Sequence, residues 1–282
     1  MEVGLALAGG GIRGIAHAGV LKALDENNIK VKAIGGTSAG SIVATLYAMG
    51  YKPYYIYVLF KKYAQEIINI SNASILNGLG NLIKSKKVGF SGLNDGIMLE
   101  KMFNEMALRK RIRLIGDIKM PLVISTVDIA EAKEYVITNC ALRDNLKDNY
   151  ITEIEVGKAV RASSSFPAFF CPCEFKNHIF MDGGVLDNTP VLPLKQICDK
   201  KIIAVNFESD SVGEDCDVMD VIMKSLDIMG NKISEKSFEQ SDLILTIPTD
   251  GAGLFDIDKL DKCYQFGYNT VMRNLKKFRD LL

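Results

Sequence analysis

Residues 31–49 read VKAIGGTSAGSIVATLYAM, and this stretch indicates the fold class. Val31–Gly36 is a short apolar run that predicts a strand, and Ser38–Met49 predicts a helix that begins directly after it. A strand followed by a helix is also predicted just before this stretch: Val3–Ala8 is a strand that ends in three glycines, and Ile12–Asn27 is a helix. Strands and helices that alternate with short connections are typical of βαβ units in a parallel sheet.

The remainder of the sequence continues this alternation. Further strands are predicted over Pro121–Asp128, Lys133–Thr138, Glu174–Met181, Lys201–Phe207 and Leu243–Pro248. Further helices are predicted over Lys52–Ile68, Gly96–Arg109, Ile154–Ser163, Val218–Ser241 and Lys259–Leu281. No repeat or linker divides the chain, so we expect residues 1–282 to form one α/β domain with three layers around a central, mostly parallel sheet.

Composition restricts the class of protein. The 282 residues are 48% hydrophobic and 24% charged, as in ordinary folded domains. Lys plus Arg and Asp plus Glu both number 34, and this balance argues against nucleic acid as the main partner. The six cysteines lack disulfide-framework spacing, and Cys171-Pro172-Cys173 has no second Cys/His pair at ligand spacing, so no metal is expected.

Neither a secretory signal nor a transmembrane helix is expected. Glu2 stands where a positive n-region would be, and Gly9–Gly11 interrupt the apolar run. Ala33–Tyr51 is uncharged over 19 residues, which is long enough to span a bilayer. Its Gly and Ser residues fit a buried strand that feeds a buried helix better. We therefore expect a reducing, cytoplasmic setting.

The turn between the second strand and its helix, Gly36-Thr37-Ser38-Ala39-Gly40, has the pattern G-x-S-x-G. A strand end that leads directly into a helix is typical of a nucleophile elbow, in which the flanking glycines let a tight turn project a serine hydroxyl. The helix N-terminus there favours a developing negative charge. The alternative is that Ser38 only caps the helix, and this motif alone does not separate the two interpretations.

The loop after the first strand, Gly9-Gly10-Gly11-Ile12-Arg13-Gly14, matches the G-x-G-x-x-G pattern of dinucleotide-binding proteins. That interpretation requires an acidic residue at the end of the second strand, which instead ends in Gly35-Gly36-Thr37-Ser38, so a nucleotide-binding reductase is disfavoured. Consecutive glycines at a helix start expose backbone N–H groups that form an oxyanion hole or an anion site. Because both loops follow adjacent parallel strands, we expect the Gly10 and Gly11 amides to face Ser38.

Ser38 needs a base, and the chain has only two histidines, His17 and His178. In α/β-hydrolases an acid and then a histidine follow the serine, an order that Asp128 and His178 would satisfy. His17 would lie about 9 Å along a helix from the glycine loop, which is a poor position for a base. Both histidines are therefore expected to be structural rather than catalytic.

Asp182-Gly183-Gly184 ends a predicted strand and offers a different base. The glycines permit a sharp turn and a close backbone approach, and a carboxylate exposed there would take the Ser38 proton directly. His178 lies four residues earlier, about 13 Å away in an extended strand, so both side chains cannot touch one serine. The alternative is that Asp182-Gly183-Gly184 is a simple hairpin turn.

Five stretches together resemble the patatin-like phospholipase family. They are LALAGGGIRGIAHAGVLKALDE at residues 5–26, GGTSAG at 35–40, AVRASSSFPAFF at 159–170, MDGGVLDNTPV at 181–191 and CYQFGYNTVMRNL at 263–275. In this order they are similar to the family's oxyanion loop, nucleophile elbow, Ala-Ser-x-x-x-Pro segment, catalytic-aspartate block and C-terminal Gly-Tyr region. The resemblance covers essentially the whole chain and closely fits the small bacterial members.

The resemblance implies a patatin-like fold and a lipid acyl hydrolase with a Ser–Asp dyad and no metal or cofactor. Ser38 would be the nucleophile, Asp182 the base, and the Gly10 and Gly11 amides the oxyanion donors. Arg13 would orient the loop or meet a lipid phosphate. The other motif positions would support this geometry: Gly9, Gly14, Gly36, Gly40, Gly183, and Gly184, where the family often has Ala.

The implied substrate is a fatty-acyl ester of a phospholipid, lysophospholipid or acylglycerol, reached by transient contact with a membrane surface. The competing hypothesis is a non-hydrolytic protein that binds lipid or acyl chains on the same fold. Residues 71–95, rich in Asn, Ser and Gly, predict a flap or lid whose apolar side chains either cover an acyl chain or form a small subdomain core. The basic runs at Lys84–Lys87 and Arg109–Arg113 either meet anionic lipid or form a solvated face.

Overall fold

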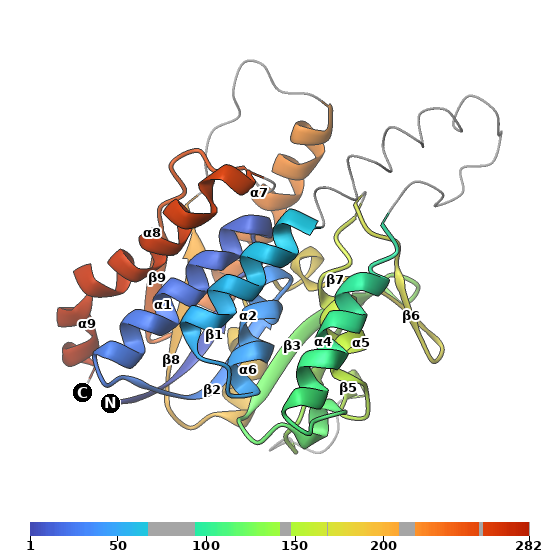
Figure 1. The fold of residues 1–282 in the computed structure, drawn as a ribbon, viewed down its shortest axis with the longest axis horizontal. Helices are drawn as coiled ribbons and strands as arrows, with labels where there is room; N and C mark the ends of the chain where they lie inside the picture. The colour runs from blue at the N-terminus through green and yellow to red at the C-terminus, as the bar shows by residue number, and fades with distance from the viewer. Residues whose placement is uncertain (67–93, 142–147, 168, 209–217, 254–255, 282) are drawn as a thin grey trace.

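A mixed β-sheet runs through the centre of the molecule in the computed structural model (Figure 1). The structure describes residues 1–66, 94–141, 148–167, 169–208, 218–253 and 256–281. For residues 218–224 and 227 it describes the backbone only. The strands are β1 (Glu2–Leu7), β2 (Lys30–Thr37), β3 (Leu122–Asp128), β4 (Lys133–Thr138), β5 (Tyr150–Ile151), β6 (Cys173–Phe175), β7 (His178–Asp182), β8 (Lys201–Phe207) and β9 (Leu243–Ile247).

The strand order across the sheet is β5-β4-β3-β2-β1-β8-β9, with β7 paired to β3 and β6 paired to β7. The central run from β3 through β2, β1 and β8 to β9 is parallel throughout. β4 and β7 pair antiparallel to β3. The prediction of a mostly parallel sheet is therefore confirmed.

Helices connect the strands and cover the sheet. They are α1 (Ile15–Glu26), α2 (Ala39–Ala48), α4 (Ile97–Arg109), α5 (Val156–Ser163), α6 (Val191–Ile197), α7 (Val218–Glu239), α8 (Leu260–Arg273) and α9 (Leu275–Asp280). Residues 53–66 form a further helix, and short 3-10 turns include Gly11–Gly14 before α1 and Gly183–Val185 after β7. The helices α1, α2 and α4 lie in front of the sheet in Figure 1.

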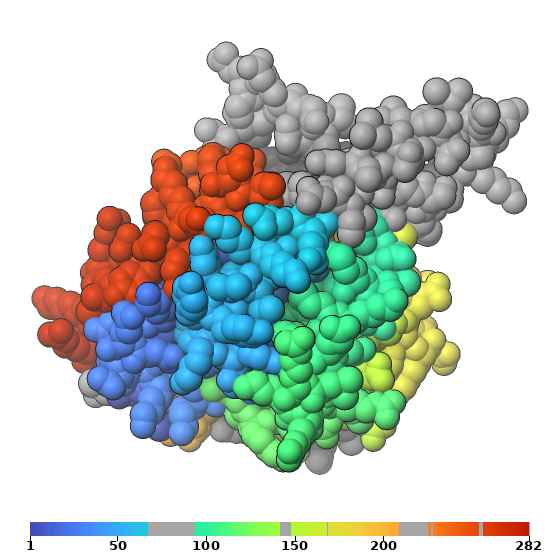
Figure 2. All heavy atoms as spheres, in the orientation of Figure 1, coloured from blue at the N-terminus to red at the C-terminus, as the bar shows by residue number. Residues whose placement is uncertain are grey.

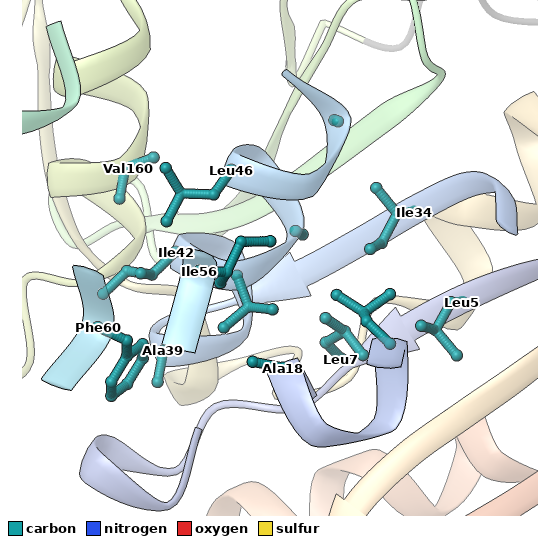
Figure 3. Packing of buried hydrophobic residues seen from close by; sticks show 14 of the residues in the cluster. Leu5, Leu7, Ala18, Ile34, Ala39, Ile42, Leu46, Ile56, Phe60 and Val160 are labelled. Atoms are coloured by element: carbon teal, nitrogen blue, oxygen red, sulfur yellow. The ribbon is translucent and has the colours of Figure 1, made fainter. Parts of the chain in front are cut away.

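Alternate strand residues point into two separate cores, which gives the fold its three layers. The larger core joins the strands to α1, α2 and residues 53–66, and its strand members include Leu5, Leu7, Ile34, Ile203 and Val205. Figure 3 shows side chains from the strands, α2 and residues 53–66 meeting in this cluster. The smaller core lies on the opposite face, where Val191 and Leu194 of α6 contact the intervening residues Ala6, Ala33, Ile202 and Ala204.

The helix of residues 53–66 ties the C-terminal part of the chain to the middle part. It lies between α8 and α4 on the face shown in Figure 2. The Tyr57 hydroxyl donates to Asp261 of α8 at 2.6 Å, and the Lys61 ammonium binds the same carboxylate at 2.7 Å. Just before this helix, the Tyr51 hydroxyl donates to the Met106 carbonyl of α4 at 2.8 Å.

The structure also differs from the sequence predictions in detail. The strand predicted over Glu174–Met181 is the hairpin β6–β7, because Lys176 turns the chain with a positive φ of 54°. The helix predicted over Lys259–Leu281 is divided into α8 and α9 at Asn274. The short elements β5 and α6 were not predicted, since two to seven residues carry too little periodicity to recognise.

The sequence also predicts a flap or lid and the absence of a membrane-spanning helix. Of the flap or lid predicted over residues 71–95, residues 71–93 lie outside the described residues. No helix in the described part of the chain is both long and apolar enough to cross a membrane. The cysteines in that part, Cys140, Cys171, Cys173, Cys198 and Cys263, are free thiols.

The contact between α1 and α8 depends on glycine. Gly19 of α1 and Gly267 of α8 face the partner helix, and a Cβ on either one would overlap a backbone oxygen, that of Tyr264 or of Ala16. The two backbones therefore approach each other more closely than any side chain allows. The predicted apolar face of the first helix, which includes Ala16 and Gly19, is the face that α8 covers.

We expect Gly267→Ala to lower the free energy of unfolding by about 1–3 kcal/mol, because the added methyl group must push the helices apart. Urea unfolding monitored by circular dichroism measures this change. Gly116→Ala is the control, since the nearest atom to its Cβ would be 3.9 Å away, and it should change stability by less than about 0.5 kcal/mol. Equal effects of the two substitutions would contradict the close contact.

Candidate active site

Two strands that end opposite each other on β3 bring the site together. β2 runs parallel to β3 and its last pair is Thr37 with Ser125. β7 runs antiparallel along the same edge of β3 and its last residue, Asp182, pairs with Thr126. Since Ser125 and Thr126 are neighbours, the carboxyl ends of β2 and β7 meet. Ser38, the residue after Thr37, therefore lies beside Asp182.

Ser38 has a strained backbone at the start of α2. Its φ and ψ are 53° and −125°, a conformation that non-glycine residues adopt at a free-energy cost of about 1–3 kcal/mol. Two glycines make the turn possible by close approach, since a Cβ on Gly36 would overlap the Gly40 carbonyl and a Cβ on Gly40 would overlap the Leu7 carbonyl. The Ser38 turn has the geometry expected of a nucleophile elbow, and Ser38 also holds the cap position of α2 without a side-chain capping bond.

The glycine loop after β1 lies next to the Ser38 turn. β1 and β2 are parallel neighbours, with Leu7 paired to Gly36, as the sequence predicts. Gly11 has a positive φ of 57°, which favours glycine. Gly10 and Gly11 both line the same cavity as Ser38, and neither amide N–H has a hydrogen-bond partner among the residues that the structure describes. Unpaired donors at a helix start can bind a negatively charged oxygen.

Asp182 is buried, with 2% of its surface exposed. Its Oδ1 accepts the Gly184 N–H at 2.8 Å, whereas Oδ2 is buried without a normal hydrogen bond to any described residue. Burial raises the pKa of the Asp182 carboxyl to about 6, although the nearby Ser38 hydroxyl and the Gly184 amide both lower it. A carboxylate with a pKa near neutrality and one unsatisfied oxygen beside a serine hydroxyl is suited to accept a proton.

The turn that follows Asp182 holds the neighbouring loops. The Thr37 hydroxyl donates to the Asp187 carbonyl at 2.9 Å, and the Gly9 N–H donates to the Asn188 carbonyl at 3.1 Å. The Asn188 side chain lies so close to the loop that a Cβ on Gly9 would be 2.5 Å from its Oδ1. Residues after Asp182 therefore fix both the elbow and the glycine loop.

An apolar cavity of about 140 Å³ opens onto this arrangement. Its walls come from every part of the site: Gly9, Gly10, Gly11, Ile12, Ser38, Ala39, Ile42, Phe60, Tyr63, Ala64, Ser164, Phe166, Pro167, Phe169, Phe170, Asp182, Gly184, Val185, Asn188, Leu226, Met229 and Gly230. Ala39, Ile42 and Phe60 also belong to the larger core (Figure 3). None of these described wall residues is basic, so the cavity suits an uncharged, apolar group.

Arg13 and His17 lie behind the glycine loop. Arg13 is buried, and its Nε donates to the Gly10 carbonyl at 3.1 Å, a contact that favours the first of its two expected roles, orientation of the loop. The His17 Nε2 lies 2.8 Å from the Ala8 carbonyl, and burial lowers the pKa of His17 to about 4 although that hydrogen bond raises it. A neutral His17 that donates to Ala8 is a structural residue.

The alternative acid–histidine pair exists, but it does not serve Ser38. The His178 Nδ1 lies 2.7 Å from Asp128 Oδ2. Burial raises the pKa of Asp128, but the contact with His178 and two backbone amides lower it by more, so the pKa lies below its ordinary value. His178 begins β7 and Asp182 ends it, and neither Asp128 nor His178 lines the Ser38 cavity. Glu131 lies near both, and the three side chains could hold a metal ion.

Other motif glycines serve as close-packing positions around the site. A Cβ on Gly14 would overlap Ala39, and a Cβ on Gly183 would overlap the Ser125 carbonyl. A Cβ on Gly184 would lie 3.0 Å from Asn188 Oδ1 and 3.1 Å from Asp182 Oδ1. Alanine at position 184 would therefore require only a small adjustment of these two side chains.

Reasoning from single motifs missed several residues of the site. Ser163 of α5 accepts the Ser38 N–H at 3.0 Å, and the Phe207 ring lies against Gly10 so closely that a Cβ there would be 2.6 Å from it. Asn188 lies in the aspartate block at residues 181–191, but the motif alone indicates no role for it. A serine run or a strand-end phenylalanine has no local pattern that indicates a partner more than a hundred residues away.

The chain belongs to the patatin-like phospholipase family. The family model for Patatin-like phospholipase matches residues 5–195, which include the glycine loop, the Ser38 turn and Asp182. The resemblance that the motifs indicated is therefore confirmed over most of the chain.

Individual relatives agree with this assignment. Lysophospholipase NTE1 of Meyerozyma guilliermondii is 32% identical over 210 residues, covering 73% of this chain and 13% of that protein. Protein YqhO of Bacillus subtilis is 31% identical over 205 residues, covering 71% of this chain and 69% of that protein. This chain thus spans only about an eighth of the NTE1 protein.

The fold matches a solved structure. VipD from Legionella pneumophila has a TM-score of 0.53 and 14% identity, over 98% of this chain and 67% of that one. At that identity the likeness concerns the fold alone, and it supports the three-layer α/β arrangement.

We expect Asp182→Asn to be more stable than the wild type above about pH 6, because the amide removes a buried charge. In the native state the pKa of the Asp182 carboxyl is about 6, above its ordinary value of 3.8. The free energy of unfolding of the wild type therefore falls as pH rises from about 4 to 6, and it stays lower at higher pH. The difference should reach about 1–3 kcal/mol at pH 8 and shrink towards zero at pH 4. Urea unfolding at the two pH values measures it, and a constant difference would contradict the raised pKa.

Proposed function

We propose that this protein is a serine hydrolase of fatty-acyl esters that works through Ser38 and Asp182. One observation carries the proposal: the Ser38 hydroxyl, an oxygen of Asp182 and the amides of Gly10 and Gly11 border one apolar cavity, and neither that oxygen nor these amides have a normal hydrogen bond to a described residue. Membership of the patatin-like phospholipase family supports it.

In the first step the Ser38 Oγ attacks the carbonyl carbon of the ester, and its proton passes to Asp182 Oδ2. The carbonyl oxygen becomes an oxyanion, which the Gly10 and Gly11 N–H groups bind; loss of one such donor costs about 3–4 kcal/mol of transition-state stabilisation. The tetrahedral intermediate then collapses, the bond to the leaving alcohol breaks, and the protonated Asp182 returns the proton to the alcohol oxygen. The acyl group remains on Ser38.

In the second step water replaces the alcohol. The Asp182 carboxylate takes a proton from the water while the water oxygen attacks the acyl carbon. The same amides bind the second oxyanion, and the Ser38 oxygen leaves as the fatty acid is released. Ser38 recovers its proton from Asp182, so both groups return to their starting state without a metal or cofactor.

The cavity favours a substrate with one acyl chain and a polar group that stays outside. Its described walls are mostly apolar and lack a basic side chain, so a charged headgroup would find no ion pair there. Met229 lines the cavity and is 55% exposed, which suits transient contact with a lipid surface at the entrance. Relatives that carry the name lysophospholipase support a single-chain phospholipid ester as the substrate.

We expect Ser38→Ala and Asp182→Asn to reduce hydrolysis of p-nitrophenyl butyrate and of a lysophospholipid to background, because each removes one partner of the proton transfer. His178→Gln is the matched control and should keep wild-type activity. Circular dichroism checks that all variants fold. An active Asp182→Asn with an inactive His178→Gln would assign the base to the Asp128–His178 pair.

An inactive wild type would favour a different function on the same fold. If a folded wild type cleaves no ester but binds fatty acid or lysophospholipid in a fluorescence titration, the protein is a lipid-binding protein. Labelling of Ser38 by a fluorophosphonate probe separates the two, because only an activated serine reacts.

We expect kcat/KM to rise with pH through an apparent pKa of about 6 and then to remain constant towards pH 8. The sign follows from the role of the base, since only the ionised carboxylate of Asp182 accepts the Ser38 proton. Initial rates with a substrate whose leaving group does not titrate in this range measure the profile. A profile that falls with increasing pH would require a protonated group instead.

A further inference from the structure

The turn at the end of α5 touches both residues of the proposed dyad. The Ser163 Oγ accepts the Ser38 N–H at 3.0 Å. Two residues later, the Ser165 carbonyl accepts the Asp182 N–H at 3.1 Å. Residues 163–165, which we call the serine turn, therefore bind the backbone of the nucleophile and the backbone of the base at the same time.

The serine turn also contacts the other side of the strained residue. The Ser164 hydroxyl donates to the Ser38 carbonyl at 3.3 Å, and the Ser41 hydroxyl donates to that carbonyl at 2.6 Å. Adjacent serines of one turn thus bind the N–H and the C=O of Ser38. A residue with a φ of 53° keeps such a conformation only where its surroundings determine it.

The helix that carries the serine turn is itself firmly held. The Gly157 N–H of α5 donates to Asn104 of α4 at 2.8 Å, and the Arg161 Nε donates to the Asp95 carbonyl at 2.8 Å. Ser163 and Ser165 are both buried, with at most 1% of their surface exposed. The serine turn can therefore act as a fixed reference for the two groups that it binds.

We propose that Ser163 is a positioning residue, and that the serine turn sets the distance and direction between the Ser38 hydroxyl and the Asp182 carboxylate. The inference rests on the proposed Ser38–Asp182 chemistry. Because the Ser38 N–H is engaged by Ser163, it is not available to the oxyanion, and that task falls to the Gly10 and Gly11 amides. Ser163 itself does not line the cavity, so its removal should alter turnover rather than substrate binding.

Ser165 provides a matched control within the same turn. Its hydroxyl donates to the Arg161 carbonyl at 2.8 Å, a bond inside the end of α5 that does not reach Ser38. The link from Ser165 to Asp182 uses the backbone carbonyl, which an alanine keeps. Ser163→Ala and Ser165→Ala thus each remove one buried hydroxyl from the serine turn, but only the first removes a side-chain contact to Ser38.

The test compares Ser163→Ala, Ser165→Ala and Ser163→Thr with the wild type, using the same ester substrates and the rate of fluorophosphonate labelling of Ser38. We expect Ser163→Ala to lower kcat and the labelling rate by about tenfold to a hundredfold, while KM changes by less than about twofold. Ser165→Ala keeps the carbonyl that binds Asp182 and should lower kcat and the labelling rate far less than Ser163→Ala does. Ser163→Thr keeps the acceptor oxygen and should recover part of the loss.

The outcomes separate this inference from the proposed function. Equal kcat values for Ser163→Ala and Ser165→Ala, with an active wild type, would overturn the positioning role and leave the dyad intact. An inactive wild type or an active Ser38→Ala would instead overturn the proposed function. If Ser163→Ala does not fold, Ser163→Cys, which keeps a side chain of similar size but a weaker acceptor, is measured in the same way and should show the same loss of kcat at constant KM.

Discussion

The site depends on one constraint of strand pairing, the division of a single edge of β3 between two strands. β2 uses that edge up to Ser125 and β7 uses it from Thr126 onwards in the opposite direction. The carboxyl ends of the two strands must therefore meet, and the residues that follow them have little freedom to separate. The serine and the aspartate are brought together by backbone hydrogen bonds, before any side-chain contact between them is considered.

Function and stability oppose each other at this meeting point. Ser38 has an unfavourable backbone conformation, and Asp182 is a carboxyl whose buried position disfavours its charged form. Both features raise the free energy of the folded state, and neither would persist without the close-packed glycines, the serine turn and the tight turn after Asp182. Local departures from the most stable arrangement at an active site are what a trade-off between activity and stability predicts.

Much of the fold could be predicted from the sequence, because the strands and helices with strong apolar periodicity were each recognised near their true ends. The glycine loop and the elbow were also placed correctly next to each other, since neighbouring parallel strands end at one edge of a sheet. The hairpin at Lys176-Asn177 was missed because the residue with the positive φ is a lysine, and Asn177 beside it is too weak a turn signal without a glycine. The contact between Ser163 and Ser38 was missed because 125 residues separate them, and only tertiary structure relates such positions.

The order of the strands has a consequence for when the protein becomes competent during its synthesis. β1 lies between β2 and β8, so the glycine loop at the start of the chain is held by residues made much later, through the Ala8 N–H to the Val205 carbonyl at 2.9 Å and the Phe207 ring against Gly10. A nascent chain that ends before β8 contains Ser38 and Asp182 but lacks the residues that support its glycine loop. Completion of this part of the sheet thus delays full support of the glycine loop until β8, which ends at Phe207, has left the ribosome.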